Sequence, residues 1–331
     1  MTHDGAPYPR LVADIGGTNA RFGWVAEPGA PISDAATYAA RAYPGLEAVI
    51  ARYLADRPGR TALASAAIAV AVPVDRDRLT MTNLAWTFSL SELRQGLGLE
   101  RLVVLNDYAA LALALPMLAA HELRQVGGGA PVADAPLAVL GAGTGLGVSG
   151  LVRAGTLALP IPGDGGHVTL AATDAAEDRV VELLRQRFGH VSAERALSGS
   201  GLVNLYRARC EIAGRPAEAL DAAGITARDA AGSDAECSAA VDLFFAFLGN
   251  VAGNLALTFG ALGGVYIGGG IVPRLGDRIA GSLFRSRFEA KGRFRDYLAA
   301  IPAWVIDPSA APALRGANRA LDAPPPGARS A

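Results

Sequence analysis

Lysine is almost absent from this 331-residue chain: Lys291 is the single one, and the other basic side chains are arginines and four histidines. A P-loop requires a lysine beside its glycines, and a protein kinase requires one on an early strand. The composition therefore excludes both kinds of nucleotide site. A phosphate group bound by this protein must be held by backbone amides, helix N-termini, a divalent cation or arginine.

Cysteine and net charge are also low. Two cysteines, Cys210 and Cys237, are too few for a disulfide framework or a Cys-rich zinc site. A net charge of −1 argues against binding to nucleic acid or a membrane surface through bulk electrostatics. The first ten residues contain no apolar signal segment, and glycine, proline and charged residues interrupt the long apolar stretches. We therefore expect a cytoplasmic protein with no membrane or nucleic-acid partner.

Apolar residues, by contrast, make up 51% of the chain, and this length is typical of two domains. Residues 10–40 contain three short strand patterns, after which helices and strands alternate up to Pro116. The second half repeats this plan, with helical spacing at about 176–188, 199–213 and 238–259. The pattern predicts an α/β fold of two related lobes, with mixed sheets flanking a central cleft.

The predicted domain boundary lies where the long helix ends near Pro116. We expect a small α/β lobe over residues 1–117 and a large α/β lobe over 118–307. A short helix at about 308–321 is expected to pack back on the small lobe. The proline-rich tail, 322–331, is expected to be disordered.

Two strand-to-strand turns are rich in glycine and threonine. The first, DIGGTNAR, carries Asp14 and Gly16–Thr18, and the second, GAGTGLG, carries Gly143–Gly145. Glycine permits positive φ and lets a ligand approach the backbone amides. Either turn alone is also typical of an ordinary hairpin. The matched pair favours a polyphosphate held from both sides by backbone N–H groups.

The second turn also matches the G-x-G-x-x-G spacing of a dinucleotide site, through Gly145, Gly147 and Gly150. That motif requires a helix to begin at the glycines, because the pyrophosphate lies on the helix N-terminus. The following residues, VSGLVRAGTLALP, instead predict a strand, a turn and a strand. The dinucleotide interpretation is therefore rejected.

Two further motifs lie at predicted strand ends. Gly268–Gly270 lies between a strand and a helix, where it fits either a flat base against the backbone or a tight turn without a ligand. Asn106 and Asp107 also end a strand and precede a helix, at the edge where open α/β sheets bind ligands. Asp107 fits either the N-cap of a helix beginning at Tyr108 or a catalytic carboxylate.

Six motifs occur in order between about residue 10 and about residue 320. They are DIGGTNAR (14–21), LND (105–107), GAGTGLG (141–147), PGDGGH (162–167), HVSAER (190–195) and YIGGGIVPR (266–274). Together they resemble the ATP-dependent bacterial glucokinases of the actin–hexokinase–Hsp70 superfamily. The resemblance implies ribonuclease-H-like lobes, ATP as phosphate donor, and phosphorylation of D-glucose at O6, the first step of glucose use in glycolysis. Relatives are commonly homodimers, so a homodimer is expected.

For the sugar, the resemblance implies that Asp107 is the catalytic base for the O6 proton and that Asn106 binds a neighbouring hydroxyl. Asp164, His167 and Glu194 match the family's other sugar-binding residues. A carboxylate is a weak base toward an alcohol, but loose phosphoryl transfer needs little activation of the nucleophile. Asp107 would mainly align O6 and take its proton late.

For the nucleotide, the resemblance implies that Thr18 and Thr144 grip the phosphates together with nearby amides. Asp14 would hold Mg²⁺ through water, because this ion loses its hydration shell reluctantly. The expected cofactor-binding residues are Asp14, Gly16, Gly17, Thr18, Asn19, Gly143, Thr144, Gly145, Gly268, Gly269 and Gly270.

The chain departs from the family at Asp164, where glutamate is usual. The shorter side chain reaches about 1.5 Å less far, which leaves a kinase for mannose or an amino sugar as an alternative. A sugar-binding regulator that has kept the fold is another alternative. The repressor relatives carry a helix-turn-helix and a Cys-rich zinc motif, and this sequence has neither.

Overall fold

The computed structural model describes residues 6–57, 63–155 and 157–322, and the statements below concern this part of the chain. The tail expected to be disordered therefore lies outside the described residues, apart from its first residue. The chain divides into two compact units. Unit 1 comprises Met1–Leu118, Pro160–Pro162 and Ala311–Ala331, and unit 2 comprises Ala119–Leu159 and Gly163–Ala310.

Unit 1 is built on a five-stranded mixed sheet in the order β3-β2-β1-β4-β7. Strands β1, β2 and β3 form an antiparallel meander, and β4 and β7 run parallel to β1. Parallel pairing requires crossover connections, which contain α1 before β4 and α2 before β7. The elements are β1 Arg10–Ile15, β2 Asn19–Val25, β3 Ser33–Ala39, α1 Leu46–Ala55, β4 Ser65–Val70, β5 Arg78–Thr80, β6 Thr87–Ser89, α2 Leu90–Gly96, β7 Arg101–Asn106, α3 Asp107–Ala114 and α11 Pro312–Ala320.

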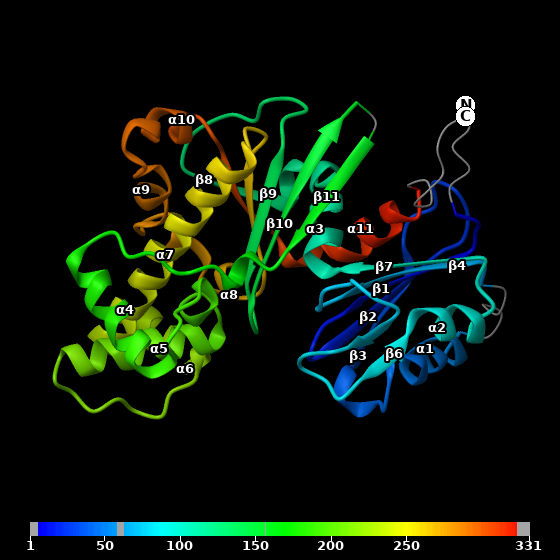
Figure 1. Ribbon diagram of the computed structural model, residues 1–331, viewed down its shortest axis with the longest axis horizontal. Helices are drawn as coiled ribbons and strands as arrows, with labels where there is room; N and C mark the ends of the chain where they lie inside the picture. Colours follow the sequence, from blue (N-terminus) through cyan, green and yellow to red (C-terminus); the bar gives the residue numbers. More distant parts are fainter. Residues whose placement is uncertain (1–5, 58–62, 156, 323–331) are drawn as a thin grey trace. The chain divides into compact units, whose positions relative to one another are not determined.

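Both faces of this sheet are covered. Leu11 and Ile15 of β1 point to one face, where they share a core with Val49 of α1. Val12 points to the other face and packs with Leu314 of α11. Figure 1 shows the same arrangement, with α1 and α2 on one side of the strands and α3 and α11 on the other.

The C-terminal helix α11 is an integral part of unit 1. It approaches α3 closely because Gly316 has no side chain: a Cβ there would lie 1.7 Å from the carbonyl oxygen of Ala110. Arg10 of β1 is 1% exposed and binds the residues after α11, donating from Nη1 to Oδ1 of Asp322 at 2.7 Å. Its Nε and Nη2 donate to the carbonyl of Ala6. A buried arginine is tolerated here because each part of its guanidinium group has a partner.

Unit 2 is built on a six-stranded mixed sheet in the order β11-β10-β9-β12-β13-β8. As in unit 1, one strand, β9, is antiparallel to the strand that follows it, β10. Strands β12 and β13 run parallel to β9. Strand β8 adds to the edge, antiparallel to β13. The mixed α/β architecture predicted from the sequence is thus confirmed. The elements are β8 Leu123–Val126, β9 Leu137–Ala142, β10 Leu146–Ala154, β11 Leu157–Gly163, α4 Ala175–Phe188, α5 Gly199–Ile212, α6 Ala222–Ala231, α7 Ala235–Phe259, β12 Val265–Gly268, α8 Ile271–Arg274, α9 Phe284–Glu289, α10 Arg295–Ala299 and β13 Ala303–Ile306.

Helix α7 overturns one expectation from the sequence. It is long and apolar enough to span a membrane by length and composition, and among the described residues it is the one such helix. Its glycines do not interrupt it: they let the carbonyls of Phe284 and Phe288 approach Gly249 and Gly253 closely. Of its most apolar 18-residue window, 72% is buried inside the protein. This is the behaviour of a core helix, and α7 contributes many of unit 2's buried side chains.

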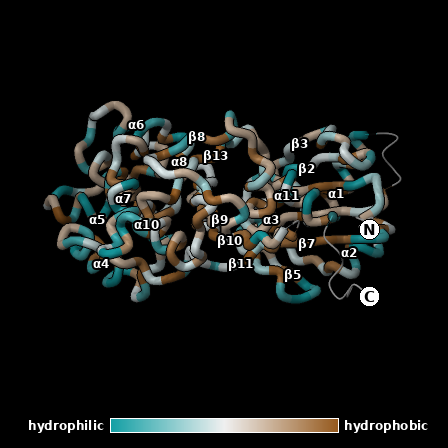
Figure 2. The backbone as a smooth tube through the Cα atoms, turned by 90° about the horizontal axis from the view of Figure 1, so that it is seen from above, coloured by the Kyte–Doolittle hydropathy of each residue, from teal (hydrophilic) through white to brown (hydrophobic). Residues whose placement is uncertain are grey.

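The sequence predicted one helix after Gly270, where the structure has α8 followed by two further helices, α9 and α10. It did not predict α6, β8 or the β5–β6 hairpin. Helix α6 buries only Ile225, so its apolar stripe is too narrow to be recognised by periodicity. Ser89 caps α2, because the amide of Glu92 donates to Ser89 Oγ at 3.2 Å. The Glu92 side chain, however, pairs with Arg78. In Figure 2, hydrophobic stretches follow the strands of each sheet, whereas the outer loops are mainly hydrophilic.

We expect Gly316→Ala to lower the free energy of unfolding by about 1–3 kcal/mol, because the added methyl group overpacks the contact between α11 and α3. Gly96→Ala is the matched control: a Cβ at this last residue of α2 meets nothing within 4 Å. Urea unfolding of both variants measures the difference. Equal stabilities would contradict the close packing at Gly316.

Candidate functional site

The strand register of unit 1 brings two carboxylates to one edge of the sheet. Strands β1, β4 and β7 are parallel, and Asp14 is aligned with Ala69, which is aligned with Leu105. Asp14 and Asp107 therefore both lie near the carboxyl ends of strands separated by two strand spacings, about 10 Å. This is the edge at which open α/β sheets bind their ligands.

Asn106, not Asp107, is the N-cap of α3. Its Oδ1 accepts hydrogen bonds from the amides of Tyr108 at 2.9 Å and Ala109 at 3.3 Å. Asp107 is the first residue of the helix, one position earlier than expected, and its own Oδ1 accepts from the Tyr108 amide at 2.9 Å. The capping interpretation of Asp107 is therefore wrong, because the amide side chain of Asn106 does that work.

The environment of Asp107 favours its protonated form. Burial raises the pKa of Asp107 to about 7, and the nearby Asp14 carboxylate contributes to the rise. Hydrogen bonds from the Tyr108 amide and the Asn106 side chain act in the opposite direction. A carboxyl group that titrates near neutral pH can accept a proton and release it again, as general base catalysis requires.

Asp14 has a partner that the sequence analysis did not identify. Arg21 lies directly opposite it on β2, and Nη1 of Arg21 donates to Oδ2 of Asp14 at 3.0 Å. Burial raises the pKa of Asp14, whereas the Arg21 guanidinium lowers it. Both residues belong to the DIGGTNAR motif, with Asp14 before the hairpin turn and Arg21 after it. Counting residues outward from the turn along β1 and β2 would have placed Arg21 opposite Asp14.

The first glycine turn does not use positive φ, contrary to expectation. Neither Gly16 nor Gly17 adopts it. Gly17 is needed for space, because a Cβ there would lie 2.7 Å from Cβ of Asn83. The turn is closed by the amide of Gly16, which donates to the carbonyl of Asn19 at 2.9 Å. Within the described chain, no group accepts a hydrogen bond from the amides of Gly17 and Thr18, so both are available to a ligand.

The second turn, between β9 and β10 in unit 2, has the same character. The Gly143 amide donates to the Gly145 carbonyl at 2.8 Å, and among the described residues nothing accepts from the amides of Thr144 and Gly145. A Cβ at Gly145 would lie 2.4 Å from Oε2 of Glu194. The antiparallel β9–β10 pair confirms the strand after the turn and the absence of a dinucleotide-binding helix there.

The third glycine cluster lies beside the second turn. Strand β12 is parallel to β9, with Gly268 aligned to Gly141, so both chains leave the sheet at the same edge. Gly269 has φ +77° and lies against the Ala142 carbonyl, which a Cβ would approach to 2.4 Å. Only glycine satisfies both conditions. Gly270 is the N-cap residue of the single-turn helix α8.

The three candidate sugar-binding residues of unit 2 gather around the start of β10. Glu194 accepts a hydrogen bond from the Leu146 amide through Oε2 at 2.9 Å. Asp164 immediately precedes a single 3₁₀ turn that ends at His167, and the His167 amide donates to the Asp164 carbonyl. Gly166 in this turn lies against the Leu146 carbonyl, leaving room for no side chain. Asp164 and His167 are exposed, whereas Glu194 is half-buried.

The start of α5 is a part of this region that the sequence analysis missed. The Gly199 amide donates to the Gly143 carbonyl at 2.9 Å, which ties the helix N-terminus to the second glycine turn. Ser198 caps the helix by accepting from the Gly201 amide. The signal was the run SGSG at 198–201, in which a capping serine is followed by small residues.

The described residues contain no group of three or more His, Cys, Asp or Glu side chains that could hold a metal ion. Mg²⁺ does not require such a group, because it keeps several waters and binds one or two carboxylates together with substrate phosphates. Asp14 and Asp107 supply two oxygen-donor groups at one strand edge. The donor set of unit 1 therefore fits a hydrated Mg²⁺ ion.

Comparisons with known proteins agree with these features. The model of the glucokinase family matches residues 11–324. A glucokinase of Aromatoleum aromaticum is 53% identical over 315 residues, which are 95% of each chain. The crystal structure of a glucokinase from an Antarctic psychrotroph has a TM-score of 0.85 at 36% identity, over 95% of this chain and 98% of that one. A ROK family glucokinase from Streptomyces griseus, in complex with glucose and AMPPNP, shares the fold at a TM-score of 0.62 and 19% identity, over 95% and 99% of the two chains.

The fold is thus one that sugar kinases adopt. Because the family model and the identity both extend over nearly the whole sequence, the chain belongs to the glucokinase family. It is an enzyme, a kinase of that family.

Asp107 is expected to destabilise the protein at alkaline pH. Its pKa in the folded state is about 7, above the ordinary value of 3.8, so the folded protein binds the proton more tightly than the unfolded chain does. Stability therefore falls as pH rises between these values. We expect Asp107→Asn to raise the free energy of unfolding at pH 8, on the order of 2 kcal/mol, and by less at pH 5.

Urea unfolding at the two pH values measures this effect. Glu27→Gln, which neutralises an exposed carboxylate in the same unit, is the control and should show no such pH dependence. A gain for Asp107→Asn that is equal at both pH values would contradict the raised pKa.

Proposed function

We propose that this protein transfers the γ-phosphate of ATP to O6 of D-glucose, giving glucose 6-phosphate and ADP, the first step of glucose use in glycolysis. The observation that carries the proposal is Asp107: a half-buried carboxyl group at a strand end, with a pKa near 7, in a chain of the glucokinase family. Relatives that are named glucokinase support glucose as the sugar.

Asp107 acts as the base of this reaction. In its ionised form it accepts a hydrogen bond from the O6 hydroxyl and aligns that oxygen with the γ-phosphorus. As the O6–phosphorus bond forms, the bond from the γ-phosphorus to the bridging oxygen breaks and ADP leaves. The O6 proton passes to Asp107, late in the transfer, because a loose transition state places little bonding on the nucleophile.

The phosphates are held by main-chain donors. The free amides of Gly17 and Thr18 in unit 1, and of Thr144 and Gly145 in unit 2, point to sites for phosphate oxygens. The hydroxyl groups of both threonines, which are exposed, add donors. Asn19, Gly16 and Gly143 shape the two turns, and Gly268, Gly269 and Gly270 admit the nucleotide close to the backbone.

Asp14 is the proposed Mg²⁺ ligand, through water. When bound, the ion would neutralise charge on the β- and γ-phosphates. Arg21 holds the Asp14 carboxylate in place from the neighbouring strand. The positive charge of Arg21 near the phosphates would stabilise their negative charge, as a lysine does in other nucleotide sites.

The sugar hydroxyls are bound by polar side chains. Asn106 uses its amide nitrogen, since its Oδ1 caps α3. Asp164, His167 and Glu194, which belong to unit 2, are the other residues proposed to bind hydroxyl groups. Hydrogen bonds of this kind, once a bound sugar covers them, discriminate against sugars that lack a matching hydroxyl.

The finer fold assignment is part of the same proposal. The two units would be the small and large lobes, each ribonuclease-H-like, as their matching strand orders suggest. A homodimer and a cytoplasmic location belong to the proposal through the family resemblance.

A kinase for another hexose, such as mannose or an amino sugar, is the second candidate. The observation that favours it is Asp164, an exposed side chain one methylene shorter than the family's usual glutamate. A weaker hydrogen bond to the sugar hydroxyl at this position would lower the specificity for one sugar over another.

Asp107→Asn should lower kcat about 10³-fold, within the usual range for loss of a general base, because the neutral amide cannot take the O6 proton. Glucose binding, measured by calorimetry, should change little. In the wild type, kcat/KM should rise with pH through about 7, as Asp107 loses its proton. Coupled assays with glucose and ATP–Mg²⁺ check both points. Retention of a tenth or more of kcat would overturn the role of Asp107.

Asp164→Glu should lower KM for glucose several-fold, since the longer side chain restores about 1.5 Å of reach, and should leave KM for ATP unchanged. Asp178→Glu, a change of the same kind at an exposed position on α4, should alter neither constant. A panel of hexoses completes the test. Wild-type kcat/KM that is higher for mannose than for glucose would favour the second candidate.

A further inference from the structure

The single lysine of the chain, Lys291, is half-buried two residues after α9 and has no part in the proposed site. Its Nζ donates to Oδ1 of Asn250 on α7 and lies 3.2 Å from the carbonyl oxygen of the same residue. Cε of Lys291 lies 3.0 Å from the ideal Cβ position of Gly253, so this glycine makes room for the lysine stem. Burial lowers the pKa of Lys291, and the Glu177 carboxylate acts in the opposite direction. An ammonium group is therefore kept in a confined place and directed at one side chain.

Lys291 determines which way the Asn250 side chain faces. Asn250 is 3% exposed, and its Nδ2 donates to the carbonyl of Ala171 at 3.0 Å. A side-chain amide has an acceptor on one side and a donor on the other, whereas an ammonium group can only donate. Lys291 therefore requires the oxygen of Asn250 on its own side, which leaves the nitrogen for Ala171. The bond from Lys291 and the bond to Ala171 support one another.

Ala171 belongs to the segment that follows the proposed sugar-binding turn. Residues 168–170 connect it to His167, and they pair with residues 191–193, which lead directly into Glu194. Two backbone hydrogen bonds of 2.9 Å join these two stretches. A displacement of Ala171 would therefore be transmitted to both stretches, and with them to two of the residues proposed to bind the sugar.

The far end of the same segment is held by α9 as well. Arg287 on α9 donates to Asp174, and its Nη2 lies 3.0 Å from Oε1 of Glu177. Glu177 is 2% exposed, and its Oε2 accepts from the amide and the hydroxyl of Thr173, each at 2.7 Å. Helix α9 itself lies along α7, as Figure 1 shows and as the close approach of its carbonyls to the α7 glycines requires. The Lys291–Asn250 bond is thus the attachment nearer to His167.

We infer that Lys291 is a positioning residue for the sugar: through Asn250 and Ala171 it holds the segments that carry His167 and Glu194 in the arrangement that binds hydroxyl groups. The inference rests on the proposed function, which assigns both residues to the sugar. Without the ammonium group, Oδ1 of Asn250 is a buried acceptor that has lost its donor, which is unfavourable. The amide relieves this by turning toward water, and its bond to Ala171 then breaks. Small displacements of binding groups are costly for the reaction.

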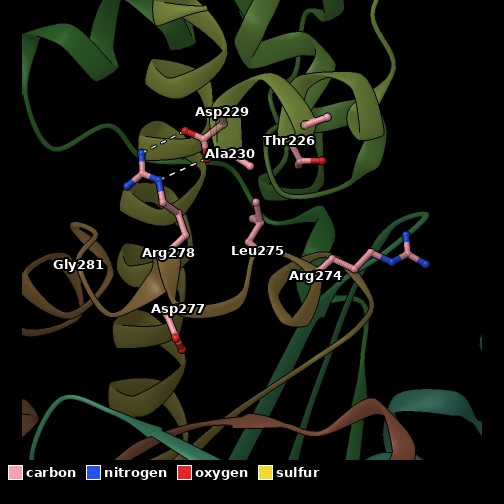
Figure 3. A pocket seen from close by; sticks show the side chains of 9 residues that line it. Thr226, Asp229, Ala230, Arg274, Leu275, Asp277, Arg278 and Gly281 are labelled. Atoms are coloured by element: carbon pink, nitrogen blue, oxygen red, sulfur yellow. Dashed lines mark hydrogen bonds and ion pairs between the residues drawn. The ribbon is translucent and has the colours of Figure 1, made fainter. Parts of the chain in front are cut away.

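The Lys291 cluster is separate from the cavity of about 630 Å³ in unit 2. That cavity lies between α6 and the segment 274–281, and Figure 3 shows Leu275 there, with Asp229 and Arg278 joined at one end. The cavity lining includes neither Lys291 nor Asn250. Substitutions at these two positions therefore leave the side chains of the cavity unchanged.

Removing the ammonium group tests the inference. Lys291→Met keeps an apolar stem of similar length, and it should raise both KM and Kd for glucose about tenfold, as expected for loss of a charge-assisted bond. It should leave kcat and KM for ATP unchanged. Arg295→Met also removes one positive charge, at an exposed position on α10, and should alter none of these constants. Coupled assays and calorimetry with glucose give the values, and circular dichroism verifies the fold of each variant. Unchanged glucose binding in Lys291→Met, or an equal change in the control, would overturn the role.

A double-mutant cycle tests whether Lys291 acts through Asn250. Asn250→Ala should raise the Kd for glucose at least as much as Lys291→Met does. The combined variant should be no weaker than Asn250→Ala alone, because the lysine has no other route to the sugar-binding segments. Additive losses would contradict this route.

A third measurement needs no variant. Because the chain has one lysine, acetic anhydride can acetylate two amino groups, that of Lys291 and that of the N-terminus. Glucose should slow the acetylation of Lys291 several-fold, since sugar binding and the Lys291–Asn250 bond stabilise each other. Acetylation of the N-terminus is the internal reference, and mass spectrometry gives both rates. A Lys291 rate that is the same with and without glucose would count against the inference.

The outcomes separate this inference from the proposed function. If the wild type phosphorylates glucose and Lys291→Met binds it equally well, the positioning role is wrong and the function stands. If Lys291→Met weakens glucose binding but the wild type does not phosphorylate glucose, the positioning role stands and the function is wrong. If the wild type does not bind glucose, the positioning role is overturned as well.

Discussion

The register of parallel strands is the constraint on which the candidate site depends. In unit 1 it aligns β1 with β7 through β4, so that Asp14 and Asp107 reach the same edge. In unit 2 it aligns β12 with β9, so that two glycine clusters leave the sheet together. A slip of one residue would turn every side chain of a strand to the opposite face. Alternate side chains of β1 are buried in the cores on the two faces of the sheet, so such a slip would cost packing on both. The core therefore fixes the positions of the site residues.

The electrostatics of unit 1 show how function opposes stability. Two carboxylates with raised pKa values lie near one another, and burial is the main cause for each. A chain selected for stability alone would not keep both. Arg21 relieves part of the repulsion by pairing with Asp14, and the N-cap bonds of Asn106 hold the helix start in place. The local arrangement thus compensates for a site that is intrinsically unfavourable.

Much of this organisation can be predicted from the sequence, because apolar periodicity and glycine clusters are local signals. The antiparallel turns, the strand ends at Asn106 and Gly268, and the long helix α7 follow from them. The pairing of Arg21 with Asp14 was missed because it depends on cross-strand register. The need for glycine at 17 depends on Asn83, which is distant in sequence. Helix α6 buries one side chain, so its apolar pattern is too weak to predict a helix.

The bond between Arg10 and Asp322 has a consequence for how the protein is made. The first strand of unit 1 buries a guanidinium whose carboxylate partner lies near the C-terminus, and α11 covers one face of the same sheet. Nascent chains usually complete their N-terminal part first. Here the N-terminal sheet lacks α11 on one of its faces until that helix has emerged from the ribosome, whereas the unit encoded in the middle can fold earlier.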